Sequence, residues 1–243
     1  MRGWRSMQSS VEAARDAVRK ARSIVVLTGS GVSAESGIPT FRSNGGYWRT
    51  HRFEDLATSE GFARDPKMVW AWYEERRRSI AATQPNAGHH ALVELEKRSK
   101  QLALVTQNVD GLHERAGSKN VIRLHGSIWA VRCLACGAEA LNYEELNNLP
   151  PVCPCGGMLR PGVVWFGEQL PEGAIERAVD EVKLADIVIV AGTSAQVYPA
   201  ASLIPLATDS AQVIEINPEA TGYSEAVTWS LRGTSADLLP QLL

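Results

Sequence analysis

Short runs of apolar, mostly β-branched residues recur along the chain, and amphipathic helical patterns separate them. The runs lie at residues 23–29 (SIVVLTG), 102–108 (LALVTQN), 186–194 (DIVIVAGTS) and 212–217 (QVIEIN). The helical patterns cover residues 9–22, 66–83, 87–99 and 172–184. Continuous apolar runs of this length are typical of strands buried on both faces. Because the runs alternate with helices, we predict an α/β fold, a Rossmann-like parallel sheet with helices on both faces and a further short strand at 121–125.

Two stretches interrupt this alternation. Residues 38–90 contain loop and helix patterns without a strand, and residues 126–160 contain every cysteine of the chain. We predict that both stretches are insertions that together form a smaller lobe, and that the sheet domain comprises residues 1–37, 91–125 and 161–243. Ligands of open α/β sheets bind beyond the carboxyl ends of the strands. The segments TGSG, TQNVDG and GTS fall at those ends.

The charge and composition of the chain exclude some classes of partner. The net charge is −2, so nothing at the level of the whole chain calls for nucleic acid or an anionic membrane surface. The N-terminus lacks the apolar core of a signal peptide, and no run of eighteen apolar residues occurs. The four cysteines are clustered in sequence, which suits a reducing compartment. We therefore expect a cytoplasmic protein, with a monomer as a plausible state.

The cysteines form two close pairs that predict a structural zinc site. Cys133-x-x-Cys136 is followed, after sixteen residues, by Cys153-x-Cys155. Two such pairs are typical of four-thiolate zinc sites, although the second pair is one residue closer than usual. Residues two apart on an extended strand point to the same side, so both thiolates can reach one ion. Four cysteine ligands leave no position for water. A disulfide or four free thiols is the alternative.

A glycine-rich loop follows the first apolar run. Gly29-x-Gly31-x-x-Ala34 satisfies the loose dinucleotide-binding pattern, in which glycines let the backbone approach a pyrophosphate. A plain tight turn is the alternative. A dehydrogenase would continue into an uninterrupted helix, whereas Gly37 and Pro39 break any helix here within two turns.

Several strings taken together resemble the sirtuins, the NAD-dependent protein lysine deacylases. They are GSGVSAESGIPTFR, TQNVDGLHERAG, LHG, LRPGVVWFGE and GTS, in the family's order. The strings span Gly29 to about Ser194, with weaker similarity to the C-terminus. The chain departs from the family at Ser30, where alanine is usual. Because serine adds little bulk, we expect NAD binding to survive this difference.

The resemblance implies that NAD is bound as a consumed co-substrate. The loop and the segment after it would wrap NAD, the TQNVD segment would surround the nicotinamide and its ribose, and GTS would lie at ribose and phosphate. Two residues near the C-terminus would line the adenosine. The residues implied are Gly29, Ser30, Gly31, Ala34, Glu35, Phe41, Arg42, Trp48, Gln107, Asn108, Asp110, Gly192, Thr193, Ser194, Asn217 and Ser235.

Among the five histidines, His125 in RLHGS matches the catalytic base of the sirtuins. An imidazole with a pKa near 6.5 is suited to accept a proton near neutrality. In the family's mechanism, the acyl oxygen attacks the ribose carbon as nicotinamide leaves, and the base then activates a ribose hydroxyl. The products are free lysine, nicotinamide and O-acyl-ADP-ribose. Asn108 is implied as the second catalytic residue. His89 and His90 are expected to be ordinary core or surface residues.

The segment VVWFGE is expected to present a backbone edge to the acylated lysine peptide. Such strand addition gives affinity through main-chain hydrogen bonds. Val164 and Phe166 are the implied substrate contacts, and Val163 is expected to be a core residue.

The predicted helix at 66–83 carries the run AWYEERRRSI. Tyr73 and Arg76 are three residues apart and hence neighbours on one face, although spacing alone does not exclude Arg77. A subgroup of sirtuins that removes succinyl and malonyl groups holds the distal acyl carboxylate with Tyr-x-x-Arg at this point, and Tyr73 and Arg76 match it. A hydroxyl and a guanidinium suit a carboxylate. We expect solvated side chains at Glu74, Glu75, Arg77 and Arg78.

The resemblance therefore implies NAD-dependent removal of succinyl, malonyl and also acetyl groups from protein lysines. The alternatives are a pure deacetylase, a protein ADP-ribosyltransferase that uses the same bound NAD, and a non-catalytic NAD- or zinc-binding module. The last would be expected to lack His125 or Asn108, and the chain has both.

Overall fold

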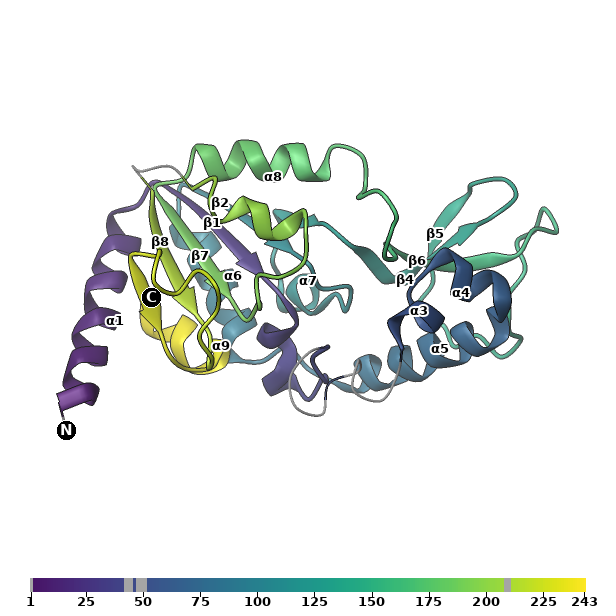
Figure 1. Ribbon diagram of the computed structural model, residues 1–243, viewed down its shortest axis with the longest axis horizontal. Coiled ribbons are helices and arrows are strands. Elements are labelled where there is room, and N and C mark those ends of the chain that lie inside the picture. Colours follow the sequence, from purple (N-terminus) through teal and green to yellow (C-terminus); the bar gives the residue numbers. More distant parts are fainter. Residues whose placement is uncertain (1, 42–45, 47–51, 208–210) are drawn as a thin grey trace.

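The protein, described here from a computed structural model of residues 2–41, 46, 52–207 and 211–243, is built on a six-stranded parallel sheet (Figure 1). The strand order is β3-β2-β1-β7-β8-β9. The strands are β1 (Ser23–Thr28), β2 (Gln101–Thr106), β3 (Val121–Arg123), β7 (Ile187–Ala191), β8 (Gln212–Ile216) and β9 (Trp229–Leu231). The predicted parallel sheet is thus confirmed, and β9 is an edge strand that the apolar pattern did not predict.

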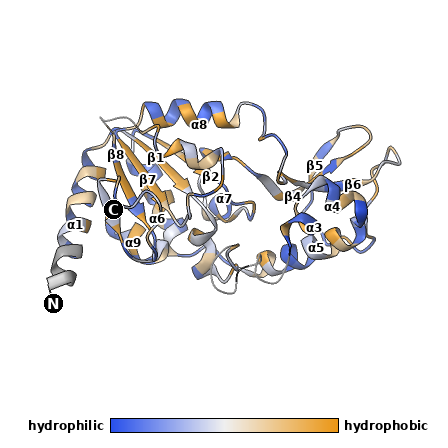
Figure 2. Cartoon of the chain, in the orientation of Figure 1, coloured by the Kyte–Doolittle hydropathy of each residue, from blue (hydrophilic) through white to orange (hydrophobic). Residues whose placement is uncertain are grey.

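Helices cover both faces of this sheet. The side chains of β1 alternate: Ile24 and Val26 belong to one core and Val25 and Leu27 to the other. The first core packs against α1 (Arg2–Lys20), α6 (Ala87–Arg98), α9 (Ser235–Leu238) and η3 (Leu239–Leu242), and the second packs against α8 (Ala174–Lys183) and η2 (Ala200–Leu203). Figure 2 shows the strands between these layers as mainly hydrophobic. Burial on both faces explains why the strands read as unbroken apolar runs.

The register places three loops at one edge of the sheet. Thr28 at the end of β1 is level with Thr106 of β2 and with Ala191 of β7. The chain continues from these strands into η1 (Ser30–Ser36), towards α7 (Leu112–Ala116), and into the segment that begins at Gly192. The glycine loop, TQNVD and GTS therefore meet at the carboxyl edge, as their positions in the sequence predicted.

A smaller lobe lies at the end of the molecule away from α1 (Figure 1). It combines α3 (Phe53–Leu56), α4 (Ser59–Arg64) and α5 (Pro66–Ala82) with the antiparallel sheet β5-β4-β6. These strands are β4 (Gly126–Cys133), β5 (Glu139–Leu141) and β6 (Leu159–Val163). A third core, which includes Trp70 and Ile128, joins the helices to this sheet. The last strand runs to Val163, beyond the expected boundary at residue 160.

Capping explains why α5 and α6 begin where the sequence predicted. The side chain of Asp65 accepts a hydrogen bond from the N–H of Met68, and Pro66 occupies the first turn of α5. Asn86 and His89 form a reciprocal capping box at the start of α6. No helix in the described parts of the chain combines the length and apolar character that a bilayer crossing requires.

Two buried histidines predict that the fold loses stability in acid. Burial lowers the pKa of both His89 and His113 to about 3, whereas an unfolded histidine titrates near 6.5. Below pH 6.5 the unfolded state therefore binds more protons than the folded state, so stability falls as the pH drops from 6.5 towards 3. At pH 5 each histidine lowers the free energy of unfolding by about 2 kcal/mol relative to neutral pH. Urea midpoints measured at pH 7.5 and pH 5 test this, and equal midpoints would contradict it.

Candidate active site

A cleft at the carboxyl edge of the central sheet gathers twelve of the residues predicted for NAD binding, substrate binding or catalysis. The loops that follow β1, β2 and β7 contribute to its lining, together with helix α5 and the segment after β6. The predicted residues that line it are Gly29, Ser30, Phe41, Tyr73, Arg76, Gln107, Asn108, His125, Val164, Phe166, Thr193 and Ser194. Residues from segments far apart in the chain thus meet around one cavity.

Other predicted residues lie behind this lining or elsewhere. Asp110 is buried and is linked to Asn108 through Ser33. Ser235 is buried at the start of α9, where it packs against Gly88. The sequence therefore did not reveal that Ser235 is covered by the fold. The remaining residues that do not line the cleft are Gly31, Ala34, Glu35, Gly192 and Asn217. Arg42 and Trp48 lie outside the described residues.

The glycines of the first loop allow it to approach the loop after β7. A Cβ atom on Gly31 would lie 2.7 Å from the carbonyl oxygen of Gly192, and one on Gly29 would lie 2.7 Å from Cβ of Thr193. The N–H of Gly31 donates to the oxygen of Gly192 at 2.8 Å. Gly37 then ends η1 in a left-handed conformation, with φ of 90°. Gly37 thus interrupts the helix after the glycines, as the sequence indicated.

A buried hydrogen-bond chain fixes the side chains of Asn108 and Asp110. Asn108 Nδ2 donates to Ser33 Oγ (3.2 Å), and Ser33 Oγ donates to Asp110 Oδ2 (2.8 Å). His89 Nδ1 accepts from the N–H of Asn86, so its Nε2 carries the proton and lies 3.4 Å from Ser33 Oγ. Burial raises the pKa of Asp110, and hydrogen bonds from Leu112 and Ser33 oppose that change. Ser33 was missed although it lies within the quoted GSGVS string.

His125 is held as a neutral base. Its Nδ1 lies 3.0 Å from the carbonyl oxygen of Gln107, which only accepts, so Nδ1 carries the proton. The lone pair is therefore on Nε2. Burial lowers the pKa of His125 below 6.5, although the hydrogen bond to Gln107 acts in the opposite direction. At neutral pH the imidazole is consequently uncharged and able to accept a proton.

Tyr73 and Arg76 bring a hydroxyl and a guanidinium to the same cleft. Both residues are buried, with exposed fractions of 3% and 6%. The guanidinium of Arg76 lies 4.6 Å from the ring centroid of Trp72 and 5.3 Å from that of Phe41. Burial raises the pKa of Tyr73, while Arg76 acts to lower it. The phenol therefore stays protonated at neutral pH and can donate a hydrogen bond.

The expectation that Glu74 and Arg77 are solvated is wrong. Their side chains are only 5% and 3% exposed, and Arg77 Nε lies 2.9 Å from Glu74 Oε1. Arg77 also donates to the backbone oxygens of Asn142 and Glu144, both at 2.8 Å. This pair therefore joins α5 to the segment after β5. Arg78 is 61% exposed at its side chain, and Glu75 is also exposed, as predicted.

The expected backbone edge at VVWFGE is partly used within the chain. The N–H of Val164 donates to the oxygen of His125 (3.0 Å), and that of Phe166 donates to the oxygen of Ala57 (2.9 Å). The N–H of Trp165 donates to Glu168 Oε2 at 2.9 Å. A peptide strand added here must therefore use other backbone groups or displace these bonds. Val163 is buried, as expected of a core residue.

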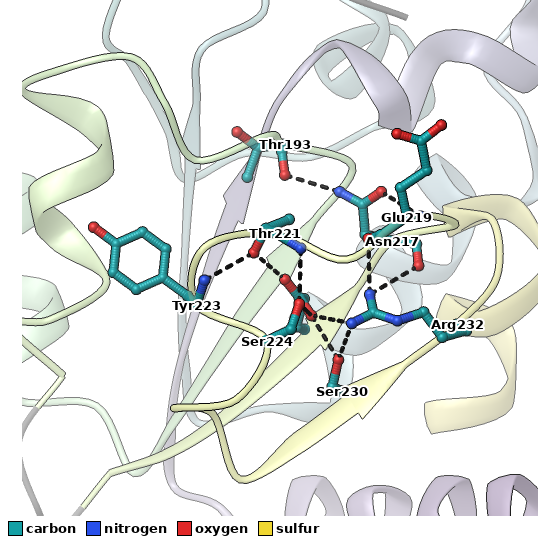
Figure 3. A network of polar contacts seen from close by, with 9 residues as sticks. Thr193, Asn217, Glu219, Thr221, Tyr223, Ser224, Ser230 and Arg232 are labelled. Atoms are coloured by element: carbon teal, nitrogen blue, oxygen red, sulfur yellow. Dashed lines mark hydrogen bonds and ion pairs between the residues drawn. The ribbon is translucent and has the colours of Figure 1, made fainter.

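A polar network ties the loop after β8 to the loop after β7 (Figure 3). Asn217 Nδ2 donates to the backbone oxygen of Thr193 at 2.9 Å, and Arg232 Nη1 donates to the oxygen of Glu219 at 2.8 Å. The buried carboxylate of Glu215 pairs with Arg232 at 3.1 Å and accepts from the hydroxyls of Thr221, Ser224 and Ser230. Asn217 thus positions Thr193, which lines the cleft, rather than lining it directly.

The four cysteines converge as one zinc site requires. Their sulfur atoms all lie within 4.8 Å of one another, with 3.5 Å between Cys133 and Cys155 and 3.9 Å between Cys136 and Cys153. Tetrahedral zinc with bonds of about 2.3 Å places its sulfurs about 3.8 Å apart. The four thiols form no disulfide. N–H groups of Cys136 and Ala135 lower the pKa of Cys133 to about 6, which favours the thiolate that zinc binds.

Comparisons with known proteins agree with one another. The model of the Sir2 family matches residues 29–199. An NAD-dependent protein deacylase of Aquifex aeolicus is 56% identical over 201 residues, which cover 82% of this chain and 84% of that protein. A solved Sir2 homologue–NAD complex is 47% identical with a TM-score of 0.90, covering 95% and 91% of the two chains. A solved Sir2–p53 peptide–NAD+ complex is 31% identical with a TM-score of 0.84, covering 93% and 94%.

Proposed function

The chain belongs to the Sir2 family, and from this premise we propose that it is an NAD-dependent protein lysine deacylase whose cleft prefers acidic acyl groups. The deacylase activity is supported by the relatives that are named for it and by the cleft, which is lined by both the glycine loop and His125. A protein substrate is supported by the similar fold that was solved with a peptide. The preference for succinyl and malonyl groups is supported by the position of two residues on α5.

The residues of the chain have distinct tasks in this reaction. NAD, as co-substrate, supplies the ribose that receives the acyl group and releases nicotinamide. His125 accepts a proton at Nε2, because its Nδ1–H is committed to the oxygen of Gln107. Ser33 fixes the orientation of the Asn108 amide in the cleft wall. The close contact between Gly31 and Gly192 brings two loops together at the carboxyl edge of the sheet, where we propose that NAD binds.

The preference for acidic acyl groups rests on one observation: Tyr73 and Arg76 line the same cleft as His125 and Asn108. An acyl-lysine with its carbonyl near His125 can therefore extend its acyl chain towards α5. A hydrogen bond to a charged group is worth about 1.5–3 kcal/mol. That corresponds to roughly ten- to more than a hundredfold in preference. An acetyl group has no second carboxylate to gain this interaction.

Replacing Arg76 by methionine tests the proposal directly. We expect Arg76→Met to lower kcat/KM for a succinyl-lysine peptide by roughly ten- to a hundredfold, because the guanidinium that pairs with the carboxylate is lost. The kcat/KM for deacetylation of the same peptide should change by no more than about threefold, because an acetyl group has no carboxylate to pair with the guanidinium.

Arg78→Met is the matched control, because Arg78 lies on the same helix with its side chain 61% exposed. It should leave both rates unchanged. If Arg76→Met lowers the two activities by the same factor, the carboxylate pocket is wrong and a plain deacetylase remains.

A further inference from the structure

The indole of Trp165 is fixed on several sides. Trp165 is only 3% exposed, and its ring lies 3.5 Å from the guanidinium carbon of Arg160 and 5.2 Å from the ring of Phe62. Glu168 accepts the backbone N–H of Trp165 and pairs with Arg160. Burial alone would raise the pKa of Glu168, but the hydrogen bonds from Arg160 and Trp165 lower it. The carboxylate therefore stays charged and holds this arrangement together.

The single N–H of this indole is directed at the hydroxyl of Tyr73. Trp165 Nε1 lies 3.0 Å from Tyr73 Oη, and both atoms are buried. An indole nitrogen only donates, so Tyr73 Oη is the acceptor in this bond. A phenol carries one proton and must direct it away from a donor that already occupies its oxygen. The proton of Tyr73 is therefore turned away from Trp165, and both side chains line the cleft.

A carboxylate differs from an acetyl methyl group in its ability to hydrogen-bond with this hydroxyl. A carboxylate only accepts hydrogen bonds, whereas a methyl group makes none. A hydroxyl that already accepts from Trp165 has its proton free to be donated to a carboxylate, so less of the interaction is lost in ordering the hydroxyl. The indole cannot make this contact itself, because its N–H is already used by Tyr73.

We propose that Trp165 is a positioning residue for acyl selection, which orients the Tyr73 hydroxyl as a donor to an acidic acyl group. This inference rests on the proposed function and deepens it. It assigns Trp165 to specificity rather than to the chemistry at His125. Arg160 takes part indirectly, since it holds the plane of the indole.

Trp165→Phe keeps an aromatic ring and removes the N–H. The quantity to measure is the ratio of kcat/KM for succinyl-lysine to that for acetyl-lysine in one peptide. We expect the ratio to fall roughly 2- to 10-fold, as the loss of one neutral hydrogen bond implies. Phe62→Leu is the packing control: it removes one aromatic contact of the ring but keeps the N–H and the Arg160 and Glu168 contacts that hold Trp165, so the ratio should stay unchanged. Deacetylation in the same preparation shows that each variant is folded.

A double-mutant cycle with Tyr73→Phe decides whether Trp165 acts through the hydroxyl. Without that hydroxyl, Trp165→Phe should cause no further fall in the ratio. An equal fall in both backgrounds overturns the inference, as does an equal loss of both activities in Trp165→Phe. If Trp165→Phe does not fold, benzothienylalanine at position 165 removes only the N–H and decides in the same way. Failure of the proposed function gives another pattern, in which Tyr73→Phe itself leaves the ratio unchanged.

Discussion

His125→Ala is expected to lower kcat for NAD-dependent deacylation by about 100- to 10,000-fold, the usual contribution of a positioned general base. The effect follows from the geometry of the ring. Its Nδ1 proton is held by the oxygen of Gln107, and burial lowers its pKa below 6.5, so Nε2 is available as the acceptor. Alanine leaves no group in this position to accept the proton. The loss should be similar for acetyl and succinyl substrates, because both share this step.

The matched control is His90→Ala, because His90 is an exposed histidine on α6. It should keep full activity. Unfolding midpoints for both variants show whether a loss of rate reflects the site or the fold. If His125→Ala retains activity within about tenfold of the unchanged protein, another group is the base.

Removal of zinc is expected to inactivate the protein by unfolding the small lobe. The cysteines lie at the end of β4 and in the segment that leads to β6, and apolar contacts from these strands join the third core. A structural zinc site contributes about 10–16 kcal/mol of apparent binding energy, much of which becomes folding energy. Cys153→Ser should therefore reduce bound zinc from one ion per chain to almost none and lower the melting temperature.

The same experiment can be run reversibly with a chelator. Metal content, tryptophan fluorescence and nicotinamide release should fall together as zinc is removed, and added zinc should restore all three. Four of the seven tryptophans, Trp70, Trp72, Trp129 and Trp165, lie in the third core, so this lobe contributes strongly to the fluorescence. Full activity and an unchanged melting temperature in protein shown to be free of metal would contradict a structural role for zinc.

The central sheet could be predicted from the sequence because its strands are buried on both faces. Burial leaves an unbroken apolar run such as SIVVLT, and helices, of which α5 and α6 have clear N-caps, separate the runs. Two strands of the small lobe, β5 and β6, have no such signal. β6 contains Pro161 and Gly162, and β5 consists of three exposed residues. Their pairing depends on contacts with β4, a strand distant from β6 in sequence.

The residues of the candidate site could be predicted where they belong to short sequence motifs, but the contacts that support these residues could not. The motifs contain most residues that line the cleft, including His125 and Asn108. The burial of Glu74 with Arg77 was missed because a charged pair on a helix is usually solvated, and nothing local indicated that the segment after β5 covers it. The bond from Trp165 to Tyr73 joins residues 92 positions apart, beyond any local pattern.

The most direct test of the acidic-acyl preference is nicotinamide release from NAD with one lysine peptide that carries acetyl, malonyl or succinyl. Because Tyr73 and Arg76 line the cleft together with His125, we predict that kcat/KM for malonyl and succinyl equals or exceeds that for acetyl. Reaction with the acetyl peptide alone would contradict this account, and so would NAD consumption without deacylation of any of the three peptides.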